Sequence, residues 1–361
     1  LFIGATFLTQ AASAVDPRDT RLLTDPAISA DRIAFAYAND LWTAKGDGSD
    51  PRRLTSHAGV ESGPRFSPDG KWIAFTGRYD GNTDVYLVPA EGGLPKRLTY
   101  HPGADTALGF TPDGKSVLFT TAREVHTTRY EQLFTVPLDG GVPAKLPIPH
   151  AFKAAISEDG NTIAYLPHSE PFTQWKHYRG GRVARIVLFN PKTYATTQVP
   201  QPEGRCNDTD PMWLAGRLCF RSDRDGEFNL YSYDPATKAV TRLTRLADFP
   251  IVNASAGAGR IVYEQAGYLH VFEPQSGQST RLKIGVAADL VEPRSRYVKG
   301  AKYARSSSIS PSGTRVAVEF RGEILTLPRE KGDDRNLTRS PGAHDRTPAW
   351  SPDGKTIAYF S

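Results

Sequence analysis

A ten-residue stretch that recurs along the chain constrains its fold more than any other feature of the sequence. The segment 66–75, FSPDGKWIAF, returns at 110–119 as FTPDGKSVLF and at 156–165 as ISEDGNTIAY. Two further copies are 309–318, ISPSGTRVAV, and 350–359, WSPDGKTIAY. The first three copies begin 44 and 46 residues apart and the last two 41 apart. A period of roughly 40–50 residues is typical of propellers and solenoids.

Each copy opens a unit of four predicted strands. Pro-Asp-Gly forms a tight turn, because proline presets φ and glycine accepts a positive φ. The apolar run that follows, such as 72–75, predicts a buried strand. A second turn at 79–82 leads to a third strand at 84–88 and a fourth at 96–99. Because one such sheet cannot cover both of its faces, the sheets are expected to pack around an axis as a β-propeller.

The count of units and the break in their period predict the domain organisation. Residues 22–285 are expected to form a six-bladed β-propeller of four-stranded antiparallel blades, with residues 286–302 as a linker. Residues 303–361 are expected to hold the first blades of a second, truncated propeller. Because the chain stops at Ser361 within a predicted strand, we expect it to be a piece of a longer protein.

The first 14 residues have the features of the end of a secretory signal peptide. A short apolar stretch precedes Ala12-Ser13-Ala14, which fits an A-x-A cleavage site. The basic region and the initiator methionine are missing, so the N-terminus is expected to be truncated. This reading predicts a periplasmic or secreted protein, and the alternative is an apolar leader without a targeting role. No stretch reaches the roughly 18 apolar residues of a membrane span.

Several motifs for chemistry are absent or explained by the repeat. The segment 109–116 fits the phosphate-loop pattern, but it is a copy of the hairpin turn and a strand follows it instead of a helix. There is no H-E-x-x-H, the eight histidines are dispersed, and no G-x-S-x-G is present. The net charge of +5 is spread over the repeats, which argues against a nucleic-acid partner. We therefore expect no metal, no cofactor and no catalytic residue in this chain.

Two further groups of polar residues have a structural explanation. Six aspartates occupy Asp-Gly turns, where we expect hydrogen bonds to the local backbone: Asp69, Asp80, Asp113, Asp159, Asp225 and Asp353. Cys219 lies in an apolar strand and Cys206 in the loop before it. Two free thiols and a disulfide in an exported protein both remain open, since the sequence does not determine the geometry.

The segment 167–182 is an insertion between the second and third strands of the fourth unit. It contains QWKHYRGG at 174–181, and loops carry function more often than the scaffold does. The candidate substrate-binding residues are Trp175, Lys176, Tyr178 and Arg179. Lys176 and Arg179 are suited to hold a peptide carboxylate. The alternative is a loop that packs between blades, with Trp175 as its anchor.

The segments 77–93 and 96–103, with Asp40-Leu41-Trp42 and the insertion 175–181, resemble the N-terminal propeller of the tricorn protease family. The resemblance spans the chain from about residue 22. It implies a large serine peptidase of the tail-specific, S41-like group, with a six-bladed propeller, a seven-bladed propeller, a PDZ-like domain and a catalytic core. The nucleophilic serine and the general-base histidine of the family would then lie downstream of residue 361.

In this family the propellers filter peptides into or out of a closed chamber, so the resemblance implies peptide substrates and a homo-oligomer formed by the full-length protein. The archaeal family member holds a peptide C-terminus with an adjacent arginine pair. The matching region 101–110 has no such pair, and Arg52-Arg53 lies in a predicted outer strand. A cytoplasmic location, as in the archaeal family member, is the alternative to export. The alternative functions are a TolB-like periplasmic binding propeller and the propeller of a prolyl-oligopeptidase-type hydrolase.

Overall fold

The computed structural model describes residues 18–127, 129–172, 174–288, 299–340 and 342–361. They fall into two compact units, one within Val15–Asp289 and one within Leu290–Ser361. Residues 1–14, and with them the predicted signal peptide, lie outside the described residues, as does most of the predicted linker. Within the described ranges no helix is long and apolar enough to cross a membrane.

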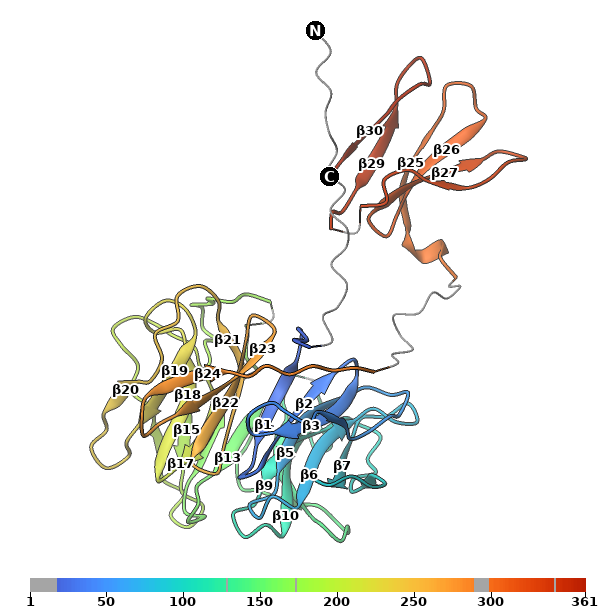
Figure 1. The fold of residues 1–361 in the computed structure, drawn as a ribbon. Coiled ribbons are helices and arrows are strands. Elements are labelled where there is room, and N and C mark those ends of the chain that lie inside the picture. The colour runs from blue at the N-terminus through green and yellow to red at the C-terminus, as the bar shows by residue number, and fades with distance from the viewer. Residues whose placement is uncertain (1–17, 128, 173, 289–298, 341) are drawn as a thin grey trace. The chain divides into compact units, whose positions relative to one another are not determined.

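The first unit consists of four-stranded antiparallel sheets, and each sheet is built from one contiguous stretch of chain (Figure 1). The first three sheets are β1 (Thr24–Ile28), β2 (Arg32–Tyr37), β3 (Asp40–Lys45) and β4 (Arg52–Arg53); β5 (Glu61–Phe66), β6 (Trp72–Gly77), β7 (Asp84–Pro89) and β8 (Lys96–Arg97); and β9 (Asp105–Phe110), β10 (Ser116–Thr121), β11 (Gln132–Pro137) and β12 (Ala144–Lys145). The next three are β13 (Lys153–Ile156), β14 (Ile163–Leu166), β15 (Val187–Phe189) and β16 (Thr196–Gln198); β17 (Asp208–Leu214), β18 (Arg217–Ser222), β19 (Asn229–Tyr233) and β20 (Val240–Arg242); and β21 (Ile251–Gly257), β22 (Arg260–Gln265), β23 (Tyr268–Glu273) and β24 (Gln278–Arg281).

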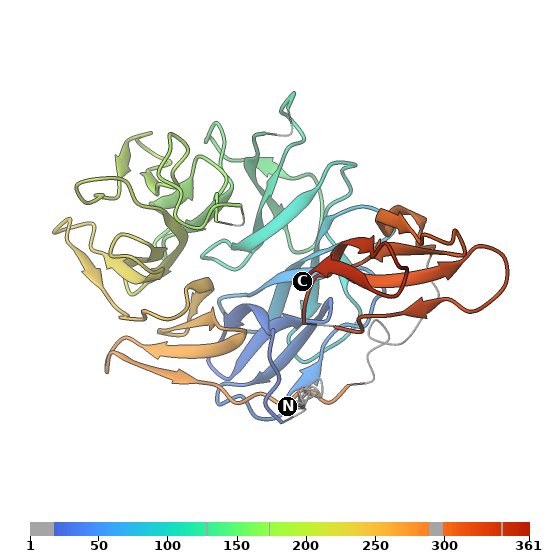
Figure 2. The same ribbon diagram turned by 90° about the horizontal axis from the view of Figure 1, so that it is seen from above.

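Apolar clusters join each sheet of the first unit to the next one along the chain. A further cluster joins the first sheet to the sixth, where Phe35 packs with Val262 and Leu269. Backbone hydrogen bonds support this junction, from Thr20 N to Ile284 O at 2.8 Å and from Leu23 N to Gly267 O at 3.2 Å. Seen from above, the sheets follow one another around the unit (Figure 2). The fold is therefore all-β and propeller-like.

The second unit repeats the same local pattern. It begins with a 3-10 turn (Ala301–Tyr303) and a four-stranded sheet of β25 (Ala304–Ile309), β26 (Arg315–Phe320), β27 (Glu323–Pro328) and β28 (Arg335–Asn336). A two-stranded sheet of β29 (Arg346–Trp350) and β30 (Ile357–Phe360) follows. At the other end of the predicted linker, Val286 is buried in the cluster that joins the first and sixth sheets.

The turns between first and second strands have the predicted hydrogen bonds. Asp113 Oδ1 accepts from Thr111 Oγ1 at 2.6 Å and from Lys115 N at 3.1 Å. Asp69 does the same in its own turn. The segment 109–116 thus forms a hairpin turn between β9 and β10, as predicted, and no helix follows it. Asp225 departs from the prediction, because its carboxylate accepts from the hydroxyl of Tyr231 at 2.8 Å instead.

The innermost strands of three sheets contain a bulge before a proline. Asp25, Gly63 and Asp210 each precede a proline and have φ values of 51°, 60° and 52°. The ladders of β1, β5 and β17 shift register at these positions. Left-handed φ is costly for most residues, but aspartate tolerates it better than most and glycine adopts it freely. A bulge re-aims side chains, and both of these aspartates line the central cavity of the unit.

Candidate functional site

A cavity of about 690 Å³ lies among the innermost strands of the first unit. All six sheets contribute to its wall through their first strands. One polar residue from each sheet, in chain order, represents this wall: Asp25, Arg65, Thr106, Lys153, Asp210 and Asn253. We call this space the central cavity. Its wall mixes these polar and charged side chains with apolar ones such as Leu108, Ile156 and Trp213, so it can contact both the polar and the apolar groups of a ligand.

Four charged side chains form one network at the sheet-four and sheet-five side of the cavity. Lys153 Nζ is paired with Glu170 Oε2 at 2.7 Å and also with Asp210. Arg221 donates from Nη2 to Glu170 Oε1 at 2.5 Å and from Nε to Asp210 Oδ2 at 2.6 Å. We call Lys153, Glu170, Asp210 and Arg221 the ion-pair quartet. Its two cations and two anions neutralise one another.

Arg221 is the most deeply buried member of the quartet, with 1% of its side chain exposed. Its Nη1 donates to the backbone oxygen of Ile251 at 2.9 Å. The rings of Phe172 and Phe228 lie 5.0 Å from the guanidinium, a distance typical of cation–π contacts. Burial alone would raise the pKa of Asp210, but Arg221 and Lys153 outweigh burial and lower this pKa to about 2. Asp210 is therefore charged at neutral pH.

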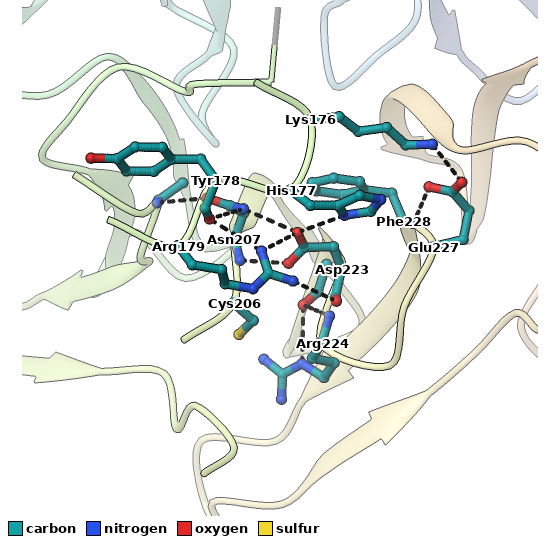
Figure 3. A network of polar contacts seen from close by, with 12 residues as sticks. Lys176, His177, Tyr178, Arg179, Cys206, Asn207, Asp223, Arg224, Glu227 and Phe228 are labelled. Atoms are coloured by element: carbon teal, nitrogen blue, oxygen red, sulfur yellow. Dashed lines mark hydrogen bonds and ion pairs between the residues drawn. The ribbon is translucent and has the colours of Figure 1, made fainter. Parts of the chain in front are cut away.

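The insertion at 167–182 supplies Glu170 and Phe172 to this network, and its second half binds the fifth sheet (Figure 3). Asp223, which is fully buried, accepts from Arg179 Nη1 at 2.6 Å. Asn207 donates to the same carboxylate from its backbone N at 2.7 Å and from Nδ2 at 3.0 Å. The insertion is thus tied at both ends to the loops and strands of the fifth sheet.

The structure pairs both cationic candidates of the insertion with carboxylates of this chain. Lys176 Nζ lies 2.6 Å from Glu227 Oε2, and Arg179 is bound to Asp223. Trp175 is 67% exposed and contacts Tyr178 edge to face, with ring centroids 6.1 Å apart. The four predicted residues are therefore close together, but only the aromatic pair is free of a charged partner. These contacts fit the alternative of a loop that packs between sheets, but charged side chains rather than the exposed Trp175 hold it there.

The ion-pair quartet is a feature that the sequence reasoning missed. Members in contact are 11 to 57 residues apart along the chain, so no local motif connects them. An acidic residue inside an insertion and an Asp-Pro pair inside an innermost strand were the available signals. Neither signal identifies a partner on its own.

The structure also answers whether the two cysteines form a disulfide and whether the described residues contain a group that could bind a metal ion. Cys206 and Cys219 are both free and buried, so the disulfide alternative is wrong. Burial raises the pKa of each thiol to about 12, which leaves both thiols protonated and unreactive. Among the described residues, no group of three or more histidine, cysteine, aspartate or glutamate side chains is placed to hold a metal ion.

Comparison with known sequences places this geometry in a family. The model of the tricorn protease N-terminal β-propeller domain matches residues 20–278. Tricorn protease homolog 2 of Streptomyces coelicolor is 32% identical over 349 residues, which cover 93% of this chain and 29% of the relative. The tricorn protease homolog of Saccharolobus solfataricus is 27% identical over 340 residues, which cover 92% of this chain and 31% of the relative. The chain thus spans less than a third of the length of these relatives.

A comparison of structures gives the same fold. The crystal structure of the tricorn protease matches 94% of this chain with a TM-score of 0.68 and 21% sequence identity, and 41% of its own chain is covered. The family model of the N-terminal β-propeller domain covers the six sheets of the first unit except for the last residues of β24. The chain belongs to the family of tricorn protease N-terminal β-propeller domains.

Proposed function

We propose that the first unit is a six-bladed propeller that gates the passage of peptides in a tricorn-like serine peptidase. The observation that supports this proposal most is the central cavity, whose wall is built from the first strand of each of the six sheets of the first unit. A hydrated cavity along the axis of a ring is a path for extended peptides, and it excludes folded proteins by size. Family membership supports a peptidase as the whole protein.

We further propose that the second unit begins another propeller, with the connection between the units as a linker. The four-stranded sheet β25–β28 and the hairpin β29–β30 have the pattern of the first unit and support this reading. The catalytic serine and histidine, of the tail-specific (S41-like) group, would lie outside residues 1–361. A purified 1–361 chain should then hydrolyse no peptide, whereas the full-length protein should cleave oligopeptides. Hydrolysis by the 1–361 chain would refute this division of roles.

A narrowed cavity gives the direct test of gating. Gly109 lines the cavity, and a Cβ at this position would meet no atom within 4 Å. Gly109→Trp in the full-length protein should slow hydrolysis of a long oligopeptide more than that of a very short fluorogenic peptide. Gly342→Trp is the matched control, because this exposed glycine of the second unit also has open space around it. Equal rates for Gly109→Trp and the parent would rule out passage through the cavity.

The insertion is a second, weaker candidate for contact with peptides. Trp175 and Tyr178 offer an aromatic pair at its surface, whereas Lys176 and Arg179 are already paired. We expect Trp175→Ala to change the KM for peptides if the loop binds them. An unchanged KM would leave the insertion with a packing role only.

Two alternatives and the location of the protein are tested by separate experiments. A TolB-like binding propeller would bind a protein partner and the full-length protein would show no hydrolysis. A prolyl-oligopeptidase-type hydrolase would place a nucleophile elbow in the remaining sequence.

Export rests on residues 1–14 alone, and cell fractionation of the full-length protein decides between the periplasm and the cytoplasm. Sedimentation of the same protein tests the proposed homo-oligomer.

A further inference from the structure

Arg65 extends from β5 into the wall of the central cavity. Its Nε donates to the backbone oxygen of Leu108 at 3.2 Å, and its Nη1 donates to the backbone oxygen of Pro64 at 2.8 Å. These two carbonyl groups hold the guanidinium against sheets two and three. No hydrogen bond from Nη2 occurs among the described residues, so this end of the side chain has donors to spare.

The charge of Arg65 has no counterpart in direct contact. Within the described ranges no carboxylate forms an ion pair with it, in contrast to the two cations of the quartet. Burial lowers the pKa of the Arg65 guanidinium, and the more distant carboxylates of Asp25 and Asp210 act in the opposite direction. An arginine stays protonated in proteins. The Arg65 side chain is half-buried in the cavity wall, where it would attract an anion more strongly than a fully exposed arginine would.

The wall around Arg65 leaves room for such an anion. Gly63 precedes it in the same strand, and Gly109 lies in the neighbouring strand β9. A Cβ at Gly109 would contact nothing within 4 Å, and one at Gly63 would meet only a backbone oxygen at 4.0 Å. Ser62 and Thr106 also line the cavity and carry hydroxyl groups. The site is therefore small, polar and open to the cavity.

We propose that Arg65 binds a carboxylate group of a peptide inside the central cavity. The N–H groups that the two carbonyls leave free can donate to both carboxylate oxygens, which is the fork geometry that arginine favours. The ligand class rests on the proposed function, because the peptide is the molecule that the cavity is inferred to pass. Peptides with an acidic side chain would thus be retained longer than their neutral counterparts.

The test uses pairs of blocked peptides and the full 1–361 chain. Two N-acetylated, C-amidated peptides that differ only by Asp or Asn are titrated by calorimetry. We expect the Asp peptide to bind about tenfold more tightly, as one charge-assisted hydrogen-bonded pair provides. Arg65→Gln should abolish this preference, and Arg65→Lys should keep part of it. Arg78→Gln, at an exposed position just after β6, is the matched control and should keep all of it.

The outcomes separate this inference from the proposed function. Equal binding of the two blocked peptides by the parent chain overturns the inference and leaves peptide passage intact. A third peptide, neutral but with a free C-terminus, shows whether a terminal carboxylate is bound in place of a side chain. If no peptide binds, peptide passage fails, and propionate is then titrated against the NMR signal of the Arg65 Nε–H. The carboxylate site is overturned if propionate shifts this signal no more than propionamide does.

Discussion

The two sides of the central cavity differ in whether their cationic side chains form ion pairs with carboxylates. On the side of sheets four and five, Lys153 and Arg221 are each bound to both Glu170 and Asp210. On the side of sheets two and three, Arg65 is held by backbone carbonyls, and no carboxylate of the described residues forms an ion pair with it. In the first arrangement the charges are paired with one another within the fold. The second leaves a charge available to a ligand.

The insertion belongs to the first side, which changes how it should be viewed. An extra loop with aromatic and basic residues suggests a binding site. Three of its charged residues, Lys176, Arg179 and Glu170, nevertheless form ion pairs with Glu227, Asp223 and the cations of the quartet. Arg65, the cation of the cavity wall for which the described residues provide no ion pair, is instead a regular strand residue. An insertion in the repeat and a cation without an ion pair are thus separate indications of a binding site. In this chain the cation without an ion pair lies in the wall of the central cavity.

The largest effect is expected from Arg221→Met. This change leaves Glu170 and Asp210 with one cation between them in a buried site, which should cost about 3–5 kcal/mol of unfolding free energy. Urea denaturation of the 1–361 chain measures it. Arg245→Met, at an exposed position, is the control and should cost little. A loss below about 1 kcal/mol for Arg221→Met would remove the contrast between the two sides.

A smaller loss is expected from Glu170→Gln, which keeps the shape of the side chain but removes its charge. Lys153 and Arg221 then share only Asp210, and about 1–3 kcal/mol should be lost. Because Glu170 ties the insertion to the quartet, amide hydrogen exchange across 167–182 should also speed up. Glu203→Gln, at an exposed position, should change neither quantity. Unchanged exchange would show that the contacts with Asp223 and Glu227 hold the loop without Glu170.

The pH dependence of stability tests the quartet without a change in packing. The folded-state pKa of Asp210 is lowered from 3.8 to about 2, so its contribution is present above about pH 4 and is lost as the pH falls towards 2. The parent should therefore lose about 2 kcal/mol more than Asp210→Asn over this range. Denaturation curves at several acidic pH values measure the difference. Parallel pH profiles for the two proteins would contradict the lowered pKa.

The smallest effect is expected from Arg65→Gln. Since no ion pair is broken and only the hydrogen bonds to Leu108 O and Pro64 O are lost, the unfolding free energy should fall by about 1 kcal/mol at most. Differential scanning calorimetry beside Arg221→Met gives the comparison directly. A large loss would mean that Arg65 supports the fold as Arg221 does, and the two sides of the cavity would no longer differ.

The fold could be predicted from the sequence because its determinants are local. The turn at 67–71 and its copies, and the apolar runs after them, specify hairpins within one stretch of chain. The insertion was located correctly for the same reason. Its contacts were not, since Lys176 and Arg179 find their carboxylates 51 and 44 residues away. Arg65 resembles any other strand arginine in sequence, and only the packed sheets show that its charge stays unpaired.

The closure of the first unit has a mechanical consequence. Each sheet is made from one contiguous segment, so no strand is shared between the first sheet and the sixth. Side-chain packing and a few hydrogen bonds, such as Thr20 N to Ile284 O and Leu23 N to Gly267 O, join these two sheets. Separating them would therefore break no β-ladder. A circular permutant that links the chain across this seam and opens it between two other sheets would therefore leave every strand pairing of the first unit unaltered.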